Sequence, residues 1–541
     1  MNRATNINHL KTESFDLLII GGGITGAGIA LDAASRGLRT ALIEKEDFAS
    51  GTSSRSTKLI HGGLRYLKQL EFALVKEVGS ERAIVHKLAP HLVVPEKMLL
   101  PLYEKRGLGY WLTSIGLKIY DWLAGVKPED QRKMLTRPQT LKYEPLLKAD
   151  DVKGGAIYAE YRTDDARLTI EITKLAITKG ACIANYIMAT DFIYENEKIV
   201  GVKATDLISK SELTINAKTV VNATGPWVDE LRSTNKSKEG KELHLTKGVH
   251  IVVPYHRLPV RQAIYFDVPD GRMIFAIPRG RITYIGTTDT DYKGDKDHVV
   301  TSREDAQYLL HAVNETFPDA LLTFADIESS WAGLRPLIHE EGKSASELSR
   351  KDEIFESPTG LISIAGGKLT GYRKMAERVV DKVIDRDFSD RDLSECKTNE
   401  LIFPGGDFRE YAEVKKLESE LVSRLDSLNL RGNEATNLVH LYGRQVLLIL
   451  DYLEKHRTDK PECDLILAKA WFAIHHEMAI KPLDFIIRRS GLLYFNHPKI
   501  DRWKHAVIDY FAQEQGWTES EKEKHGVEVD QALQEVVSFN Q

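Results

Sequence analysis

Residues 15–44 read FDLLIIGGGITGAGIALDAASRGLRTALIE, and this stretch decides the fold of the first part of the chain. An apolar run at 15–20 is followed at once by GGGITG (21–26) and then by an alanine-rich segment at 27–35. This order predicts a strand, a tight turn and a helix. The chain therefore opens with a Rossmann-like unit that suits a dinucleotide.

The three spaced glycines of this turn have separate functions. Gly21 permits the turn, Gly23 lets the backbone approach a pyrophosphate, and Gly26 allows the helix to pack closely on the strand. The N-terminus of the helix then faces the phosphate charge. A second strand ends on Glu44, where the fold presents a carboxylate to a ribose hydroxyl. This unit alone leaves NAD and FAD both open.

Composition places the chain among ordinary globular proteins. Its 541 residues carry 74 basic and 79 acidic side chains, a net charge of −5, and 42% are hydrophobic. These values exclude disordered, collagen-like and coiled-coil chains, and near-neutral charge gives no electrostatic case for a nucleic-acid partner. At roughly 150 residues per domain, two to four domains are expected.

Cysteine content and the N-terminus indicate a reducing, cytoplasmic compartment. The three cysteines include no CxxC pair, so neither a disulfide framework nor a cysteine metal site is expected. Residues 1–14 are polar and lack the features of a signal peptide. No apolar run reaches 18 residues, which argues against a spanning helix and leaves a membrane surface open.

Two stretches superficially resemble metal sites, and we predict no metal at either. Residues 289–294 begin like a calcium loop, but Val300 stands where the loop needs its acidic twelfth ligand. The sequence HHE (475–477) lacks the spacing of a zinc motif.

The stretch FASGTSSRSTKLIHGGLRYL (48–67) is dense in hydroxyls and glycines and then presents His61, Arg65 and Tyr66. It suits either a pyrophosphate site next to a reacting anion or a solvated serine-rich loop.

Further along the chain, TVVNATG (219–225) predicts a buried strand that returns to the nucleotide sheet. Gly225 then lies either at the cofactor or in a plain core strand. The strand-rich run 249–292 predicts a further sheet, and its His250 fits a core residue of a strand.

Residues 21–67, VNATGPW (221–227), KGVHIVV (247–253), IGTTD (285–289), GLRPL (333–337) and GGKLTGYR (366–373) together closely resemble the FAD-dependent glycerol-3-phosphate dehydrogenase family, in its bacterial aerobic, quinone-linked form. The match covers essentially the whole chain. The resemblance implies FAD rather than NAD as cofactor. It also implies oxidation of sn-glycerol 3-phosphate to dihydroxyacetone phosphate, by hydride transfer from C2 to FAD N5, with the electrons passing to membrane quinone.

The expected fold class is α/β plus α+β: a Rossmann-like FAD-binding domain with an inserted antiparallel-sheet substrate domain and a C-terminal all-helical cap domain. The predicted segments are FAD-binding at 1–80, 181–220 and 346–387, a mixed helical segment shared by the FAD and substrate domains at 81–180, mainly substrate-binding sheet at 221–345, and the helical domain at 400–541.

The resemblance assigns site residues to three groups. Catalytic residues are expected among His61, His250 and Arg335, with the two histidines unranked as the general base and an arginine-assisted path open. Substrate phosphate is expected to meet Arg65, Tyr66, Arg335 and Lys368. Residues 366–373 precede a helical run at 375–384, whose N-terminus would face the N1–C2=O edge of the flavin. The expected cofactor-binding residues are Gly21, Gly23, Gly26, Glu44, Thr52, Ser53, Ser54, Thr57, Lys58, Gly225, Gly367, Lys368, Leu369 and Thr370.

Transfer of electrons to quinone predicts a peripheral, monotopic position on the inner face of the cell membrane. Residues 108–126 combine Trp111 and Trp122 with basic residues, which suits either a bilayer interface or a helix packed on the protein. The sequence leaves the oligomeric state open, with a homodimer among the options.

Three other functions compete with this reading. The main alternative is a glycerophosphate oxidase that produces hydrogen peroxide, disfavoured because the oxidases' usual mid-chain insertion is missing. An amine or amino-acid oxidase is disfavoured because Arg65, Arg335 and Lys368 suit a phosphate. A flavin-fold scaffold without catalysis is disfavoured by the intact motifs.

Overall fold

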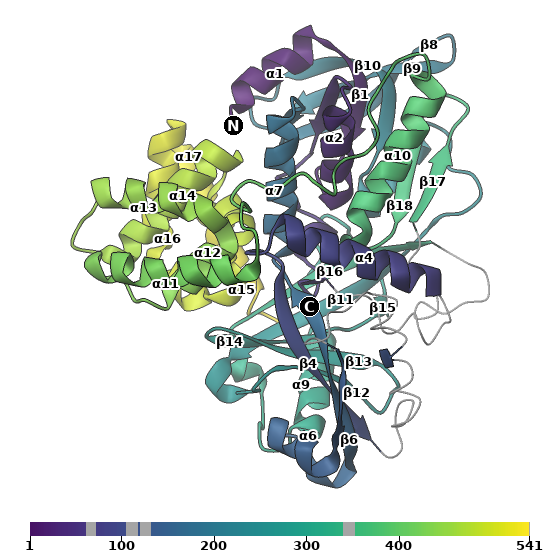
Figure 1. Ribbon diagram of the computed structural model, residues 1–541. Helices are drawn as coiled ribbons and strands as arrows, with labels where there is room; N and C mark the ends of the chain where they lie inside the picture. Colours follow the sequence, from purple (N-terminus) through teal and green to yellow (C-terminus); the bar gives the residue numbers. More distant parts are fainter. Residues whose placement is uncertain (61–71, 104–116, 119–130, 339–351, 540–541) are drawn as a thin grey trace.

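The computed structural model describes residues 1–60, 72–103, 117–118, 131–338 and 352–539. Two sheets and a cluster of helices make up this part of the chain (Figure 1). The first sheet lies at the top of the view, the second at the bottom, and the C-terminal helices lie to one side against α7 (Asp165–Thr178).

The first sheet has a parallel centre. Its middle strand, β1 (Ser14–Ile20), lies between β10 (Glu212–Asn222) and β2 (Thr40–Ile43), and all three run parallel. Two more parallel strands extend it, β18 (Ile362–Gly366) next to β10 and β7 (Cys182–Ala184) next to β2. Antiparallel strands complete the sheet: β17 (Asp352–Glu356) on β18, and the hairpin β8 (Ile187–Glu195) and β9 (Lys198–Asp206) on β10.

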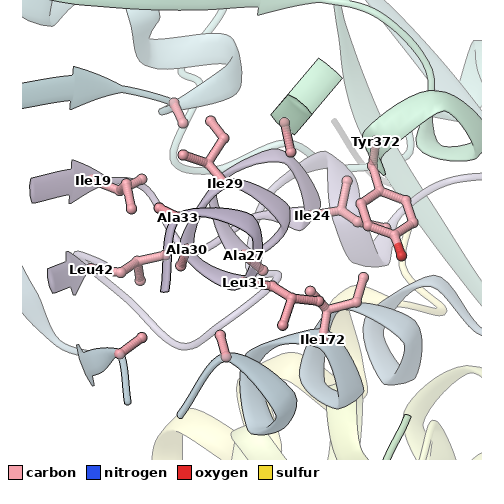
Figure 2. Close-up of a cluster of buried hydrophobic side chains, with 14 of the residues drawn as sticks. Ile19, Ile24, Ala27, Ile29, Ala30, Leu31, Ala33, Leu42, Ile172 and Tyr372 are labelled. Carbon is pink, nitrogen blue, oxygen red and sulfur yellow. The ribbon is translucent and has the colours of Figure 1, made fainter. Parts of the chain in front are cut away.

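Helix α2 (Ile24–Ser35) connects β1 to β2 and packs between α7 and α10 (Tyr372–Asp387). Figure 2 shows its alanines turned toward Ile19 and Leu42 of the sheet, with Ile172 and Tyr372 on neighbouring helices. Small residues are needed here because a Cβ on Gly28 would lie 2.9 Å from the Tyr372 ring. The helix is therefore fixed tightly above the centre of the sheet.

The second sheet is almost entirely antiparallel. Strand β11 (Leu243–Pro254) pairs antiparallel with both β14 (Ile282–Gly286) and β16 (Ser329–Ile338). The remaining strands are β13 (Met273–Arg279), β12 (Ala263–Asp267), β4 (Val94–Tyr103), β6 (Val152–Arg162), β3 (Leu59–Ile60), β5 (Lys133–Thr136) and β15 (Thr290–Asp291). Among the described pairs, only β12 and β4 run parallel.

The other helices lie around these sheets: α1 (Arg3–Thr12), α4 (Phe72–Leu88), α6 (Arg137–Tyr143), α8 (Val228–Thr234) and α9 (Arg303–Thr316). Short 3₁₀ turns occur at η1 (Thr52–Ser54), η3 (Ala149–Asp151), η4 (Gly225–Trp227), η5 (Tyr255–Arg257), η6 (Phe324–Asp326), η7 (Leu369–Gly371) and η8 (Gly443–Gln445).

The helices after residue 400 form the cap domain: α11 (Tyr411–Ser427), α12 (Glu434–Tyr442), α13 (Val446–Lys455), α14 (Pro461–Glu477), the π-helix η9 (Asp484–Arg489), α15 (Leu492–Phe495), α16 (His497–Gln515) and α17 (Glu519–Glu535). Among the described residues, no helix is both long and apolar enough to cross a membrane.

The predicted fold class is confirmed, while the domain boundaries stay a prediction. Residues 81–180 contribute strands β4, β5 and β6 to the second sheet as well as helices, and the first two residues of 221–345 are the last two of β10. The helix predicted at 375–384 is longer, since α10 begins at Tyr372 and ends at Asp387.

Buried charges fasten the cap domain to α7. The guanidinium of Arg167 donates from NH1 to Glu477 Oε2 at 2.7 Å and from NH2 to Glu171 Oε1 at 2.6 Å. All three side chains are inaccessible to water, so each charge depends on its partners for the solvation it lost on folding. Lys174 also pairs with both carboxylates, at 2.8 Å and 3.3 Å, so removing the guanidinium would leave two buried carboxylates with one cation.

Changing Arg167 to Met is expected to lower the free energy of unfolding by about 3–5 kcal/mol, because the buried Glu171 and Glu477 would then share the single cation of Lys174. Arg424→Met is the control, since Arg424 pairs with the exposed Asp451 and Glu454 and should lose under about 1 kcal/mol. Urea unfolding followed by circular dichroism measures both. Equal losses would contradict the buried network's role.

Candidate active site

The predicted cofactor residues gather at one edge of the first sheet. The four parallel strands β1, β2, β10 and β18 end there, because the carboxyl ends of parallel strands lie on the same side. The glycine turn follows β1, Glu44 follows β2, Gly225 lies just beyond β10, and Gly367 follows β18. Residues far apart in sequence thus meet where open α/β sheets hold their ligands.

Steric limits fix the glycine turn. Gly21 has φ +116°, and a Cβ there would lie 2.6 Å from the carbonyl oxygen of Ala223. A Cβ on Gly26 would lie 1.9 Å from the carbonyl oxygen of Gly21, so only hydrogen fits. At the N-terminus of α2, Ser53 Oγ accepts a hydrogen bond from the amide of Ile24 at 2.9 Å. The start of α2 therefore lies against residues 52–54, and the start of a helix is where proteins commonly bind phosphate.

Glu44 lies directly beside this turn. Its Oε2 accepts from the amide of Gly22 at 2.6 Å and its Oε1 from the amide of Glu46 at 2.9 Å. Burial raises the pKa of the Glu44 carboxyl to about 7. Each carboxylate oxygen has a further lone pair to offer a hydroxyl. The expected contact with a ribose stays a prediction.

The segment after β18 forms the start of α10. Gly366 and Gly367 have φ of +78° and +80°, and residues Lys368 to Thr370 lead through η7 into the helix, as the sequence predicts. A Cβ built on Gly225 or Gly371 would meet no atom within 4 Å. Open space therefore borders the backbone just after β10, at Gly225, and at the start of α10, next to Gly371. The glycine turn, the helix N-termini and this space fit FAD.

Residues 51–58 connect the glycine turn to the second sheet. Thr52 Oγ1 donates to the carbonyl of Leu334 at 2.7 Å. The indole of Trp331 donates to the carbonyl of Ser56 at 3.2 Å, and the Tyr284 hydroxyl donates to the carbonyl of Thr57 at 3.1 Å. These bonds hold one face of the loop on strands β14 and β16.

Lys58 anchors the end of the same loop. Its buried ammonium group donates to Asp165 Oδ1 at 2.5 Å and to the carbonyl of Ser54 at 3.0 Å. Asp165 also accepts from the amide of Ser56 at 2.9 Å. The Lys58 ammonium is therefore engaged by the protein itself, and its predicted contact with the cofactor stays a prediction.

His250 of β11 is buried and held on three sides. Its ring stacks on Trp331 with centroids 4.7 Å apart and planes at 12°, and its Nε2 lies 3.0 Å from Thr57 Oγ1. Only a glycine fits opposite, because a Cβ on Gly286 would lie 2.1 Å from the ring. Burial, followed by the charges of Arg335 and Lys58, lowers the pKa of His250 well below its ordinary value. The imidazole is therefore neutral at physiological pH.

Arg335 of β16 lies beside His250. Its NH2 donates to Thr287 Oγ1 at 2.9 Å, and its NH1 donates to Asp289 Oδ1 at 3.1 Å. The guanidinium lies over Gly248, where a Cβ would approach NH2 to 2.3 Å. Since residues 248 and 250 share one face of β11, guanidinium and imidazole are neighbours on the sheet.

Several predicted site residues lie outside the described part of the chain: His61, Arg65 and Tyr66, and all of 108–126 except 117–118. Sequence reasoning missed Trp331, Tyr284 and Asp165. The only signal for Trp331 was its position two residues before the GLRPL motif. Within the described ranges, no three His, Cys, Asp or Glu side chains gather as metal ligands.

The chain is similar in sequence to known flavoproteins along most of its length. Residues 16–372 match the model of the FAD dependent oxidoreductase family, and residues 396–522 match the C-terminal domain of alpha-glycerophosphate oxidase. The aerobic glycerol-3-phosphate dehydrogenase of Bacillus subtilis is 48% identical over 99% of this chain and 98% of its own length.

Two solved structures place the fold. The glycerol-3-phosphate dehydrogenase from Bacillus halodurans, complexed with FAD, superposes with a TM-score of 0.85 at 44% identity, covering 100% of this chain and 98% of that one. The L-alpha-glycerophosphate oxidase from Mycoplasma pneumoniae, with FAD bound, shares the fold at a TM-score of 0.56 and 17% identity, covering 72% and 97%. From the strand ends, the glycine turn and this full-length similarity, the chain belongs to the FAD-dependent glycerol-3-phosphate dehydrogenase family.

Proposed function

We propose that this chain oxidises sn-glycerol 3-phosphate to dihydroxyacetone phosphate and passes the electrons to membrane quinone. The names of its relatives support the substrate. The observation that carries the proposal is the pair of His250 and Arg335 on the second sheet, a neutral imidazole next to a fixed guanidinium. An acceptor for a hydroxyl proton thus lies beside a cation that suits phosphate.

Arg335 binds the phosphate of the substrate in this proposal. Asp289 and Thr287 hold the guanidinium in place, so little side-chain entropy is lost when an anion arrives. Gly248 leaves the space that the guanidinium occupies. Lys368, Arg65 and Tyr66 are proposed to complete the phosphate site.

His250 is proposed to take the proton from the C2 hydroxyl. When Nε2–H donates to Thr57 Oγ1, the lone pair of Nδ1 is the acceptor, and Nδ1 has no hydrogen-bond partner among the described residues. Stacking on Trp331 keeps the ring in this orientation. FAD, when bound, supplies the acceptor for the hydride that leaves C2. His61 is the other candidate base.

Two molecules are candidates for the electron acceptor: membrane quinone and oxygen. Quinone implies peripheral attachment at the inner face of the cell membrane, for which residues 108–126 are the proposed segment, and a homodimer stays an open option. Oxygen is the second candidate, favoured by the match of residues 396–522 to the C-terminal domain of an oxidase.

Anaerobic addition of sn-glycerol 3-phosphate to the FAD-loaded protein is expected to bleach the flavin absorbance near its visible maximum, because two electrons move to the cofactor. Stopped-flow spectroscopy measures the rate. Glycine and proline serve as control substrates and should leave the spectrum unchanged. A flavin that stays oxidised with sn-glycerol 3-phosphate would exclude the proposed reaction.

Arg335→Ala is expected to lower kcat/KM for sn-glycerol 3-phosphate by about 10- to 100-fold, the loss typical of a hydrogen bond between charged groups. Free glycerol, which has no phosphate, should lose far less. Arg281→Ala is the matched control, because Arg281 lies in the turn between β13 and β14 of the same sheet, in an exposed ion pair with Glu328. Equal losses for glycerol and its phosphate would remove Arg335 from the phosphate site.

The acceptor is tested by turnover in air with and without a soluble quinone analogue. A dehydrogenase is expected to reduce the quinone quickly and to release little hydrogen peroxide, because oxygen is not its acceptor. Peroxide in a one-to-one ratio with the dihydroxyacetone phosphate formed, unaffected by quinone, would establish the oxidase instead.

A further inference from the structure

The loop after β2, residues 44–51, shapes one side of the glycine turn. Glu44 accepts from the amide of Gly22 at 2.6 Å, and the amide of Ala49 donates to the carbonyl of Gly22 at 3.0 Å. A Cβ on Gly22 would lie 3.0 Å from the ring of Phe48. A shift of this loop would therefore move Gly22 and the turn in which it lies.

The cap domain holds this loop through Asp47. The carboxylate accepts from Arg489 NH2 at 2.8 Å and from Arg488 Nε at 2.5 Å, and Arg489 NH1 makes a second contact. Asn185, next to the loop, also donates to Asp47 Oδ1, at 3.2 Å. Both arginines belong to η9, so two residues of the cap fix an FAD-domain loop from 441 and 442 positions away.

The cluster of Asp47, Asp484, Arg488 and Arg489 contains equal numbers of acidic and basic side chains, and they are almost completely buried. Asp47 and Arg489 are fully buried, and Arg488 also pairs with the buried Asp484 at 2.9 Å. Burial would raise the pKa of Asp47, but the charges of Arg489 and Arg488 outweigh it and lower that pKa to about 2. Two carboxylates thus face two guanidinium groups, and removing one member leaves a buried charge that its remaining partners no longer balance.

We propose that Arg488 and Arg489 are positioning residues for FAD: by fixing Asp47, they hold Glu44 and Gly22 in the shape that the cofactor needs. This rests on the FAD site of the proposed function. It makes the cap domain a part of the cofactor site, although its helices supply none of the predicted cofactor contacts. FAD affinity should then respond to a substitution in η9.

A general loosening of the cap is the competing explanation. A variant of Lys174 distinguishes the two explanations. The ammonium group of Lys174 joins α7 to the cap through Gln445 at 2.6 Å and Glu477 at 3.3 Å, and its side chain is buried. Lys174 makes none of the contacts described for residues 44–51. Lys174→Met therefore weakens the same domain interface without releasing Asp47.

The experiment titrates FAD-stripped protein with FAD and follows the quenching of flavin fluorescence. Arg489→Met and Asp47→Asn are each expected to raise the Kd of FAD by about ten-fold or more, as loss of supporting contacts does at other cofactor sites. The variant that carries both Arg489→Met and Asp47→Asn should lose no more FAD affinity than either single variant, because both substitutions release the same loop. Lys174→Met should stay within about two-fold of the unaltered protein.

At saturating FAD, the KM of Arg489→Met for sn-glycerol 3-phosphate should equal that of the unaltered protein, since the substrate sheet is untouched. Asp47→Asn keeps the shape of the side chain, so it remains informative if Arg489→Met fails to fold. Unchanged FAD affinity in Asp47→Asn, or equal weakening in Lys174→Met, would overturn the proposal. The titration measures FAD affinity without substrate. It therefore tests the role of Arg489 even if the protein does not oxidise sn-glycerol 3-phosphate.

Discussion

The whole arrangement depends on the close approach of α2 to β1 at the glycine turn. With 1.9 Å between a Gly26 Cβ and the Gly21 carbonyl oxygen, the helix can start only where no side chain intervenes. That start sets the direction of the free amides of α2 and brings Ser53 to the helix N-terminus. The carboxyl ends of β2, β10 and β18 then complete the cofactor site around this helix start.

A second constraint links the cofactor edge to the substrate sheet. Residues 51–58 begin beside α2 and lead into β3 of the second sheet, and the side chains of Trp331 and Tyr284 donate to two of their carbonyls. His250 shares this contact through Thr57. The imidazole, the indole beneath it and the loop therefore form one packed unit, so the groups proposed for chemistry are held at a set position relative to the nucleotide fold.

Local patterns in the sequence predicted β1, the glycine turn, the helix after it and β2, as well as a helix after residue 373, because each depends on residues close in the chain. The start of that last helix was placed three residues too late, since α10 begins at Tyr372. The family resemblance predicted FAD and the three-part fold, both of which the comparisons confirm. Helix α1 was not predicted, since its polar sequence has only Leu10 buried. The stack of Trp331 on His250 requires the register of β11 with β16, and the Asp47 cluster joins residues 441 apart; neither leaves a local pattern.

The order of synthesis gives the Asp47 cluster a further meaning. A ribosome adds Asp47 441 residues before Arg488 and 442 residues before Arg489. Until then the loop beside Gly22 lacks its two guanidinium partners, and its carboxylate must remain in water. A nascent FAD domain therefore lacks these partners of Asp47 until η9 of the cap domain has been made.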